Sequence, residues 1–178
     1  YYLPDYLPTK PAMLRTLRIL LLSGLLTAAV ATQVQAASPN IVVLTIKGVI
    51  NPVVADYISR GLEVAEGSNA VACIIQMDTP GGLDKAMRDI VQDIVNARVP
   101  VVVYVSPSGA RAASAGVFVT MAAHVAVMAP NTSIGAASPV AIGPQGEAEV
   151  SKTMEEKILN DAAAYIRSIA QAHGRNME

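Results

Sequence analysis

The stretch "AVACIIQMDTPGGLD", residues 70–84, joins an unbroken apolar run to a turn that contains one proline and two adjacent glycines. A short apolar run that ends in turn residues is typical of a strand buried on both faces. In the residues that follow, 83–97, Leu83, Met87 and Ile90 recur at helical spacing. The stretch therefore predicts a strand that passes through a tight turn into a helix, the repeating unit of a parallel sheet.

The same alternation continues along the chain. Strands are predicted at 41–50, 70–77, 101–105 and 123–128, and helices at 52–67, 83–97 and 151–173. This order indicates an α/β fold with a mostly parallel sheet and covering helices. In such sheets, function gathers in the loops beyond the carboxyl ends of the strands. Two loops there are chemically unusual, "MDTPGGLD" at 77–84 and "PSGARAASAG" at 107–116.

Composition limits the classes of function. The 178 residues are 52% apolar and 15% charged, with a net charge of −1 and no tryptophan, so nothing favours a nucleic-acid partner. A single cysteine, Cys73, excludes an internal disulfide, and its apolar neighbours indicate a core side chain. The two histidines are far apart in the sequence, so neither a metal site nor a cofactor is expected.

The N-terminal residues carry a targeting pattern. Residues 1–12 are interpreted as an upstream extension and 13–36 as a signal peptide, with Arg15 and Arg18 before the apolar run "ILLLSGLLTAAVA" and a small-x-small site "VQA". The alternative is an uncleaved anchor, although the run is shorter than the ~18–20 residues that span a bilayer. The domain proper is expected at 37–178, outside the cytoplasm.

Ser114 is the first candidate catalytic residue. It is surrounded by alanine and glycine, and a nucleophilic serine on a tight strand-to-helix turn needs such small neighbours. The N–H of Ala115, at the start of the following helix, could help to bind an oxyanion. The alternative is that Ser114 only caps that helix.

Gly81 and Gly82 form the second candidate. Adjacent glycines let a backbone bend freely and approach a ligand closely, and their N–H groups are natural partners for Ala115 in an oxyanion hole. Taken alone, the loop could equally be an ordinary strand-to-helix turn.

Three segments carry a family resemblance: "MDTPGGL" (77–83), "ARAASAG" (110–116) and "MAPNTSIGAASPV" (128–140). Together, and in this order, they resemble the ClpP-class serine proteases, above all the membrane-associated NfeD group related to signal peptide peptidase A. The resemblance runs over 41–176. It implies a ClpP/crotonase-like fold, Ser114 as nucleophile, and an oxyanion hole from Gly81 or Gly82 with Ala115.

The base is harder to assign. In the ClpP type of triad, the histidine lies about 25 residues after the serine, but that region here, "AASPVAIG", contains none. His124 and His173 are interpreted as structural or surface histidines. The NfeD group uses a Ser–Lys dyad, which places Lys157 as the base. A lysine base must be neutral, so its pKa must fall from ~10.4 to about 7–8, and this requires apolar surroundings.

The pattern around Lys157 allows both roles. It lies beside an apolar stripe on the last helix that is expected to face the core, formed by Met154, Ile158, Ala162, Tyr165 and Ile169. The alternative is a surface ion pair between Lys157 and Asp161. Lys152, at the start of the helix, is expected to be solvated.

The expected function is that of an extracytoplasmic serine endopeptidase that cleaves apolar polypeptide segments. The uncharged segment 133–146 could line its cleft. The resemblance adds a stomatin-like membrane partner and a C-terminal membrane portion that this chain does not contain; a homo-oligomer is also expected. The alternatives are a catalytically silent scaffold for membrane-protein assembly and, less favoured because Arg111 alone is a thin CoA-binding patch, a crotonase-like acyl-thioester enzyme.

Overall fold

The computed structural model describes residues 39–178 except 141, 144–145, 148–150 and 178. The predicted extension, 1–12, and signal peptide, 13–36, lie outside the described residues. No helix within the described part of the chain combines the length and apolar character needed to cross a membrane.

Four parallel strands form the main sheet, in the order β1-β2-β3-β5. They are β1 (Ile41–Lys47), β2 (Ala72–Asp78), β3 (Val101–Val105) and β5 (Val125–Met128). Each strand lies beside the previous one, so the register aligns their alternating side chains in rows. One such row places Leu44, Ile75 and Val103 side by side, and all three are buried.

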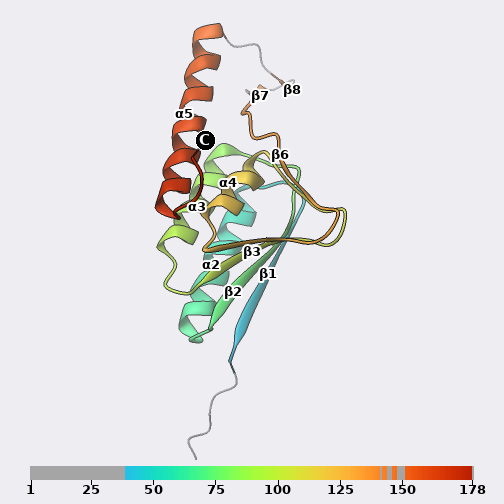
Figure 1. Ribbon diagram of the computed structural model, residues 1–178, viewed down its shortest axis with the longest axis vertical. Coiled ribbons are helices and arrows are strands. Elements are labelled where there is room, and N and C mark those ends of the chain that lie inside the picture. Colours follow the sequence, from blue (N-terminus) through green and yellow to red (C-terminus); the bar gives the residue numbers. More distant parts are fainter. Residues whose placement is uncertain (1–38, 141, 144–145, 148–150, 178) are drawn as a thin grey trace, which may run out of the picture. The chain divides into compact units, whose positions relative to one another are not determined.

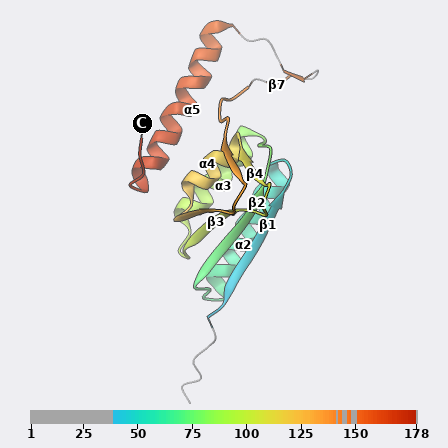
Figure 2. The same ribbon diagram turned by 45° about the vertical axis from the view of Figure 1, so that its right-hand side comes forward.

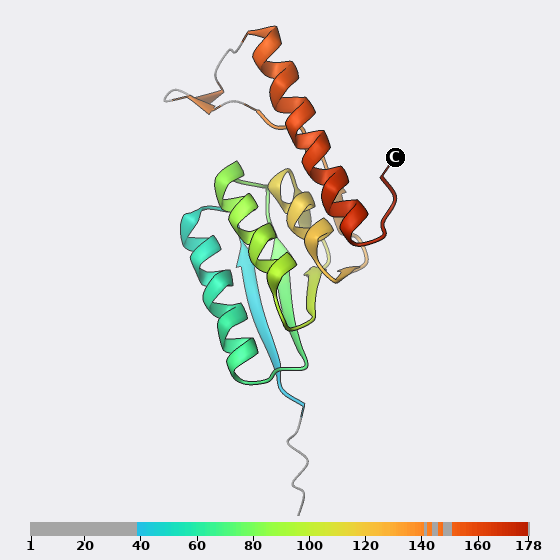
Figure 3. The same ribbon diagram turned by 90° about the vertical axis from the view of Figure 1, so that its left-hand side faces the viewer.

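Helices cover one face of this sheet (Figure 1, Figure 3). The helices are α2 (Pro52–Gly67), α3 (Asp84–Asn96), α4 (Ala115–Ala122) and α5 (Lys152–Ala172). The covered face carries Cys73, which is fully buried, and burial raises the pKa of its thiol to about 11. Cys73 is therefore a core side chain, as predicted.

The other face of the sheet is open within the described residues. Ile41 and Val43 of β1 are 49% and 57% exposed, and Val125 of β5 is 51% exposed. The strands are apolar on both faces, which predicted a sheet covered on both sides. Among the described residues, helices cover only one of these faces.

Short strands that were not predicted fix the loops above the sheet. β4 (Arg111–Ala113) pairs in parallel with β6 (Ser133–Gly135), and β7 (Ile142–Gly143) pairs with β8 (Gly146–Glu147) (Figure 2). Small and turn-forming residues made these segments look like loops. They form strands because a neighbouring backbone supplies their hydrogen bonds, which no local propensity encodes.

Helix α5 contacts the core through its second half only. Ile169 and Ala170 are buried, and Ala162 and Tyr165 pack against the core, whereas Met154 is 48% exposed. The prediction that the apolar stripe faces the core along its whole length was therefore wrong for its first turns. The apolar stripe runs along most of α5, but only the second half of the helix packs against the core, and the first turns extend past it into solvent.

Candidate active site

The two unusual loops meet at one edge of the sheet, because β2 and β3 are parallel neighbours whose carboxyl ends point the same way. Their backbones pair directly. The N–H of Thr79 donates to the carbonyl of Arg111 at 2.7 Å, and the N–H of Ala113 donates to the carbonyl of Thr79 at 3.1 Å. The loop after β2 is therefore bonded to β4, the short strand that ends immediately before Ser114.

Ser114 adopts a backbone conformation that L-residues rarely take. Its φ is 51° and its ψ is −118°, and it lies half-buried between β4 and α4. Such a conformation costs on the order of 1–3 kcal/mol and persists where the surrounding structure enforces it. Although Ser114 occupies the N-cap position, its side chain makes no capping bond. The alternative role as a helix cap was therefore wrong.

Both glycines of the opposite loop fit where no larger residue would. Gly81 has a φ of +114°, and a Cβ there would lie 2.6 Å from the Cβ of Ser114. A Cβ on Gly82 would lie 2.0 Å from the carbonyl oxygen of Ile50. The glycine loop is thus pressed against the serine turn on one side and against Ile50 on the other.

The amides of the two glycines are not equivalent. The N–H of Gly81 donates to the hydroxyl of Thr79 at 3.0 Å. Among the described residues, the N–H of Gly82 makes no hydrogen bond, and neither does the N–H of Ala115, the first residue of α4. An amide at a helix start has no intrahelical partner. Gly82 and Ala115 consequently each present a free amide beside Ser114.

Ser114 opens into a cleft of about 250 Å³ that continues toward α5. Its lining includes Gly82 and Ala115 and is otherwise mostly apolar. The lining residues are Gly82, Leu83, Asp84, Met87, Ser114, Ala115, Phe118, Ala137, Pro139, Val140 and Ala162. A second hollow of about 260 Å³ shares Phe118, Ala137, Pro139 and Ala162 with the cleft and also touches Leu159 and Ile166 of α5, so the two hollows are neighbours.

Lys157 does not line this cleft. It lies on the exposed first half of α5, five residues before Ala162, which does line it. The structure therefore brings Ser114, Ala115, Gly81 and Gly82 together and leaves Lys157 outside the group.

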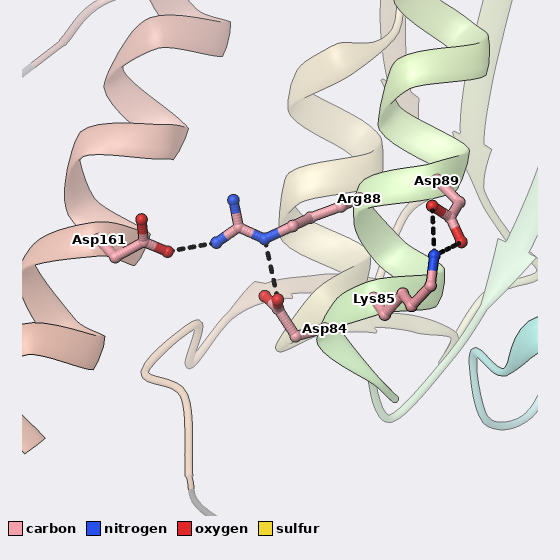
Figure 4. Close-up of polar contacts among 5 residues, drawn as sticks. All are labelled: Asp84, Lys85, Arg88, Asp89 and Asp161. Carbon is pink, nitrogen blue, oxygen red and sulfur yellow. Dashed lines mark hydrogen bonds and ion pairs between the residues drawn. The ribbon is translucent and has the colours of Figure 1, made fainter. Parts of the chain in front are cut away.

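The carboxylate that could pair with Lys157 is engaged elsewhere. Arg88 of α3 bonds Asp84 at 2.8 Å through Nε and contacts Asp161 of α5 through Nη2 (Figure 4). Its guanidinium also lies 4.3 Å from the ring centroid of Tyr165. Within the described residues Lys157 forms no ion pair with Asp161, so the predicted alternative role for Lys157 is not realised. Arg88 instead fastens α5 to α3 next to the cleft.

Neither histidine lies in the cleft. His124 accepts a hydrogen bond from the N–H of Val101 at its Nδ1, and its ring meets the ring of His173 edge-on at 5.9 Å. Burial, together with the charge of Arg175, lowers the pKa of His173. The pair lies beyond the C-terminal end of α4, and the eight residues of that helix separate it from Ser114 by about 12 Å.

Two residues of the site escaped the sequence analysis. Thr79 supplies the hydroxyl that holds Gly81, and Arg88 links α3 to α5. A threonine directly before Pro-Gly-Gly is a detectable signal, because a hydroxyl there can bond a backbone amide two residues on. No local pattern links Arg88 to Asp161, which are 73 residues apart.

The packing of the glycine loop gives a stability prediction. Gly82→Ala should lower the free energy of unfolding by about 2 kcal/mol or more, because the new Cβ meets backbone that cannot move aside. Gly67→Ala is the matched control: nothing lies within 4 Å of a Cβ there, and the change should be neutral or slightly stabilising. Urea unfolding of both variants measures the difference, and equal stabilities would contradict the observed packing.

Comparison with known proteins places these features in a family. The model for the NfeD1b N-terminal domain matches residues 40–178. The membrane-bound protease PH1510 of Pyrococcus horikoshii is 43% identical over 163 residues, which cover 90% of this chain and 36% of that protein. This chain thus spans little more than a third of the length of that relative.

Solved structures agree. A serine-to-alanine mutant of the 1510-N membrane-bound stomatin-specific protease superposes with a TM-score of 0.72 at 42% identity, covering 79% of this chain and 67% of the other. A lysine-to-alanine mutant of the same protease, solved with a substrate peptide, gives the same TM-score and identity and covers 64% of its chain. A mutant of ClpP1 from Listeria monocytogenes gives a TM-score of 0.57 at 25% identity, over 76% of this chain and 74% of the other. The fold is thus ClpP-like, and this chain belongs to the NfeD1b N-terminal domain family.

Proposed function

We propose that this chain is the catalytic domain of a serine endopeptidase, with Ser114 as the nucleophile. One observation carries the proposal: Ser114 is held in a strained turn, without a capping bond, at the mouth of an apolar cleft beside two free amides. A serine whose only task was structural would gain nothing from this conformation, whereas a nucleophile needs to be exposed at a tight turn.

In the proposed reaction this arrangement supplies the nucleophile and the oxyanion donors, and Lys157, assigned by the family resemblance, supplies the base. Oγ of Ser114 attacks the scissile carbonyl carbon, and the amine of Lys157 takes the hydroxyl proton. The negative oxygen of the tetrahedral intermediate accepts hydrogen bonds from the N–H groups of Gly82 and Ala115. When the C–N bond breaks, the Lys157 ammonium returns the proton to the leaving amine. Water then hydrolyses the acyl ester and regenerates the serine.

The cleft suits an apolar polypeptide. Phe118, Pro139 and Val140 line it, and few charged groups face it. The relatives are named as membrane proteins, and the 1510-N structures are described as stomatin-specific. These names support a membrane-associated protease with a stomatin-like protein as partner or substrate. Export across the membrane and self-association of the chain remain predictions.

The position of Lys157 favours a second candidate. With its base outside the cleft, the chain could be a catalytically silent scaffold for membrane-protein assembly. The two candidates differ in whether Ser114 reacts.

Labelling with a fluorophosphonate separates them. The protease predicts a single covalent adduct on Ser114, located by peptide mass spectrometry, and parallel loss of hydrolysis of an internally quenched apolar peptide. Ser108, an exposed serine in the same loop, is the matched control and should stay unlabelled. An unlabelled Ser114 in a chain that also fails to cleave the peptide would favour the scaffold.

A further inference from the structure

We propose that Thr79 is a positioning residue of the active site, whose hydroxyl sets the glycine loop so that the N–H of Gly82, rather than that of Gly81, faces the oxyanion. The inference rests on the proposed function, since it concerns the geometry of that same site.

Thr79 is polar, yet it is 0% exposed. Its hydroxyl accepts a hydrogen bond from the N–H of Gly81 at 3.0 Å and lies 3.2 Å from the carbonyl oxygen of Gly81, to which it donates. One side chain therefore satisfies both backbone groups of one residue. Because Gly81 has a positive φ that few residues share, this pair of bonds fixes the peptide on each side of it.

The Gly81 carbonyl has a second partner, which fixes the direction of the next residue. It accepts a hydrogen bond from the N–H of Ile50 at 2.8 Å, and the N–H of Leu83 donates to the carbonyl of Ile50 at 2.9 Å. Gly82, between these two bonds, has no partner for its own N–H among the described residues. The bonds on both sides of Gly82 turn its amide away from Ile50, and Gly82 lines the cleft.

The remainder of Thr79 is bound to the nucleophile turn. Its backbone pairs with Arg111 and Ala113 of β4. A Cβ on Gly116, in the first turn of α4, would lie 2.6 Å from the methyl carbon of Thr79, so the two residues are in close contact. Thr79 consequently joins the strand before Ser114, the helix after it and the glycine loop opposite it. This position lets one residue set the distance between nucleophile and oxyanion donors.

Removing the Thr79 hydroxyl should weaken binding of the transition state more than binding of the substrate. In Thr79→Val the shape and the methyl contact remain, but the N–H of Gly81 loses its partner and the loop is free to turn that amide toward the cleft. Misplacement of one oxyanion donor should lower kcat about 10- to 100-fold while KM changes little. Affinity for a peptide boronic acid, which forms a tetrahedral adduct, should fall by a similar factor.

Conservative variants separate positioning from packing. Thr79→Ser keeps the hydroxyl and loses the methyl, so it should retain most of kcat even if it lowers the melting temperature. Thr120→Val is the matched control, because Thr120 is also buried and its hydroxyl also donates to a backbone carbonyl, that of Gly116 at 2.7 Å, but within α4. Thr120→Val should leave kcat unchanged.

A second readout does not depend on activity. Amide hydrogen exchange followed by NMR should show faster exchange at Gly81 in Thr79→Val than in the wild-type chain, and wild-type rates in Thr120→Val. Normal kcat in Thr79→Val, or equal losses in Thr79→Val and Thr79→Ser, would overturn the positioning role while leaving the protease intact. A wild-type chain that neither cleaves the peptide nor labels at Ser114 would instead overturn the proposed function, and with it the catalytic part of this inference.

Discussion

Ser114→Ala is expected to reduce kcat/KM for an apolar peptide by about 10³-fold or more, because Ser114 is the only hydroxyl or thiol among the described residues that line the cleft. The melting temperature should stay within a few degrees of the wild-type value, since the described structure shows no hydrogen bond of the Ser114 side chain that the change would remove. Peptide hydrolysis and thermal unfolding of the same preparation measure both effects. Ser108→Ala is the control and should behave as wild type.

Ser114→Gly tests the role of Ser114 and the strain of its backbone in one variant. Glycine adopts a φ of 51° without the steric cost that serine bears there, so this variant should be as inactive as Ser114→Ala yet more stable, by about 1 kcal/mol. A gain in stability accompanied by loss of turnover is what a strained nucleophile predicts. An active Ser114→Ala chain, or a Ser114→Gly chain less stable than Ser114→Ala, would contradict the assignment of strain and function to this residue.

The main sheet was predictable because its strands are encoded locally. Residues 70–77 and 101–105 are continuous apolar runs, and the structure places β2 and β3 within about a residue or two of them. The short strands β4 and β6 could not be predicted, because alanine, serine and glycine carry little strand propensity. They exist because each offers the other a row of backbone partners, which depends on the fold having already formed.

The candidate site was predictable to a similar degree. Ser114 and the two glycines stood out because a hydroxyl among alanines and glycines, and a Pro-Gly-Gly turn, follow two neighbouring strands of the predicted sheet. The sequence left Gly81 and Gly82 equivalent, and the structure distinguishes them by the bond from Gly81 to Thr79, by the bonds to Ile50 and by the place of Gly82 in the cleft. The exposure of the first half of α5 was not predicted. Helical periodicity shows which residues share a face of the helix, but not how much of that face meets the rest of the protein.

Lys157 is the position at which sequence and structure diverge most. The resemblance places it as the base, and neither histidine lies near Ser114. It is nonetheless exposed, and five residues, or about 7.5 Å along the helix axis, separate it from Ala162 at the edge of the cleft. For Lys157 to act as base, its amine has to come within hydrogen-bonding reach of Ser114 from a position outside the cleft. A shift of α5 that brings Lys157 to Ser114 therefore has to preserve or break the contact between Arg88 and Asp161, which joins α5 to α3.

The dyad predicts that Lys157→Ala lowers kcat to near the level of Ser114→Ala, and that Lys157→Arg does the same, because a guanidinium does not give up its proton at working pH. Lys152→Ala, which removes a charge from the same exposed half of α5, should remain active. Fluorophosphonate labelling of Ser114 should slow in Lys157→Ala, because the hydroxyl then lacks its proton acceptor. Substantial turnover in Lys157→Arg would show that another group takes the proton, and Ser114 would then be a nucleophile without a lysine partner. Equal losses in Lys157→Ala and Lys152→Ala would instead indicate that charge along the first half of α5, and not a proton acceptor at one position, supports the reaction.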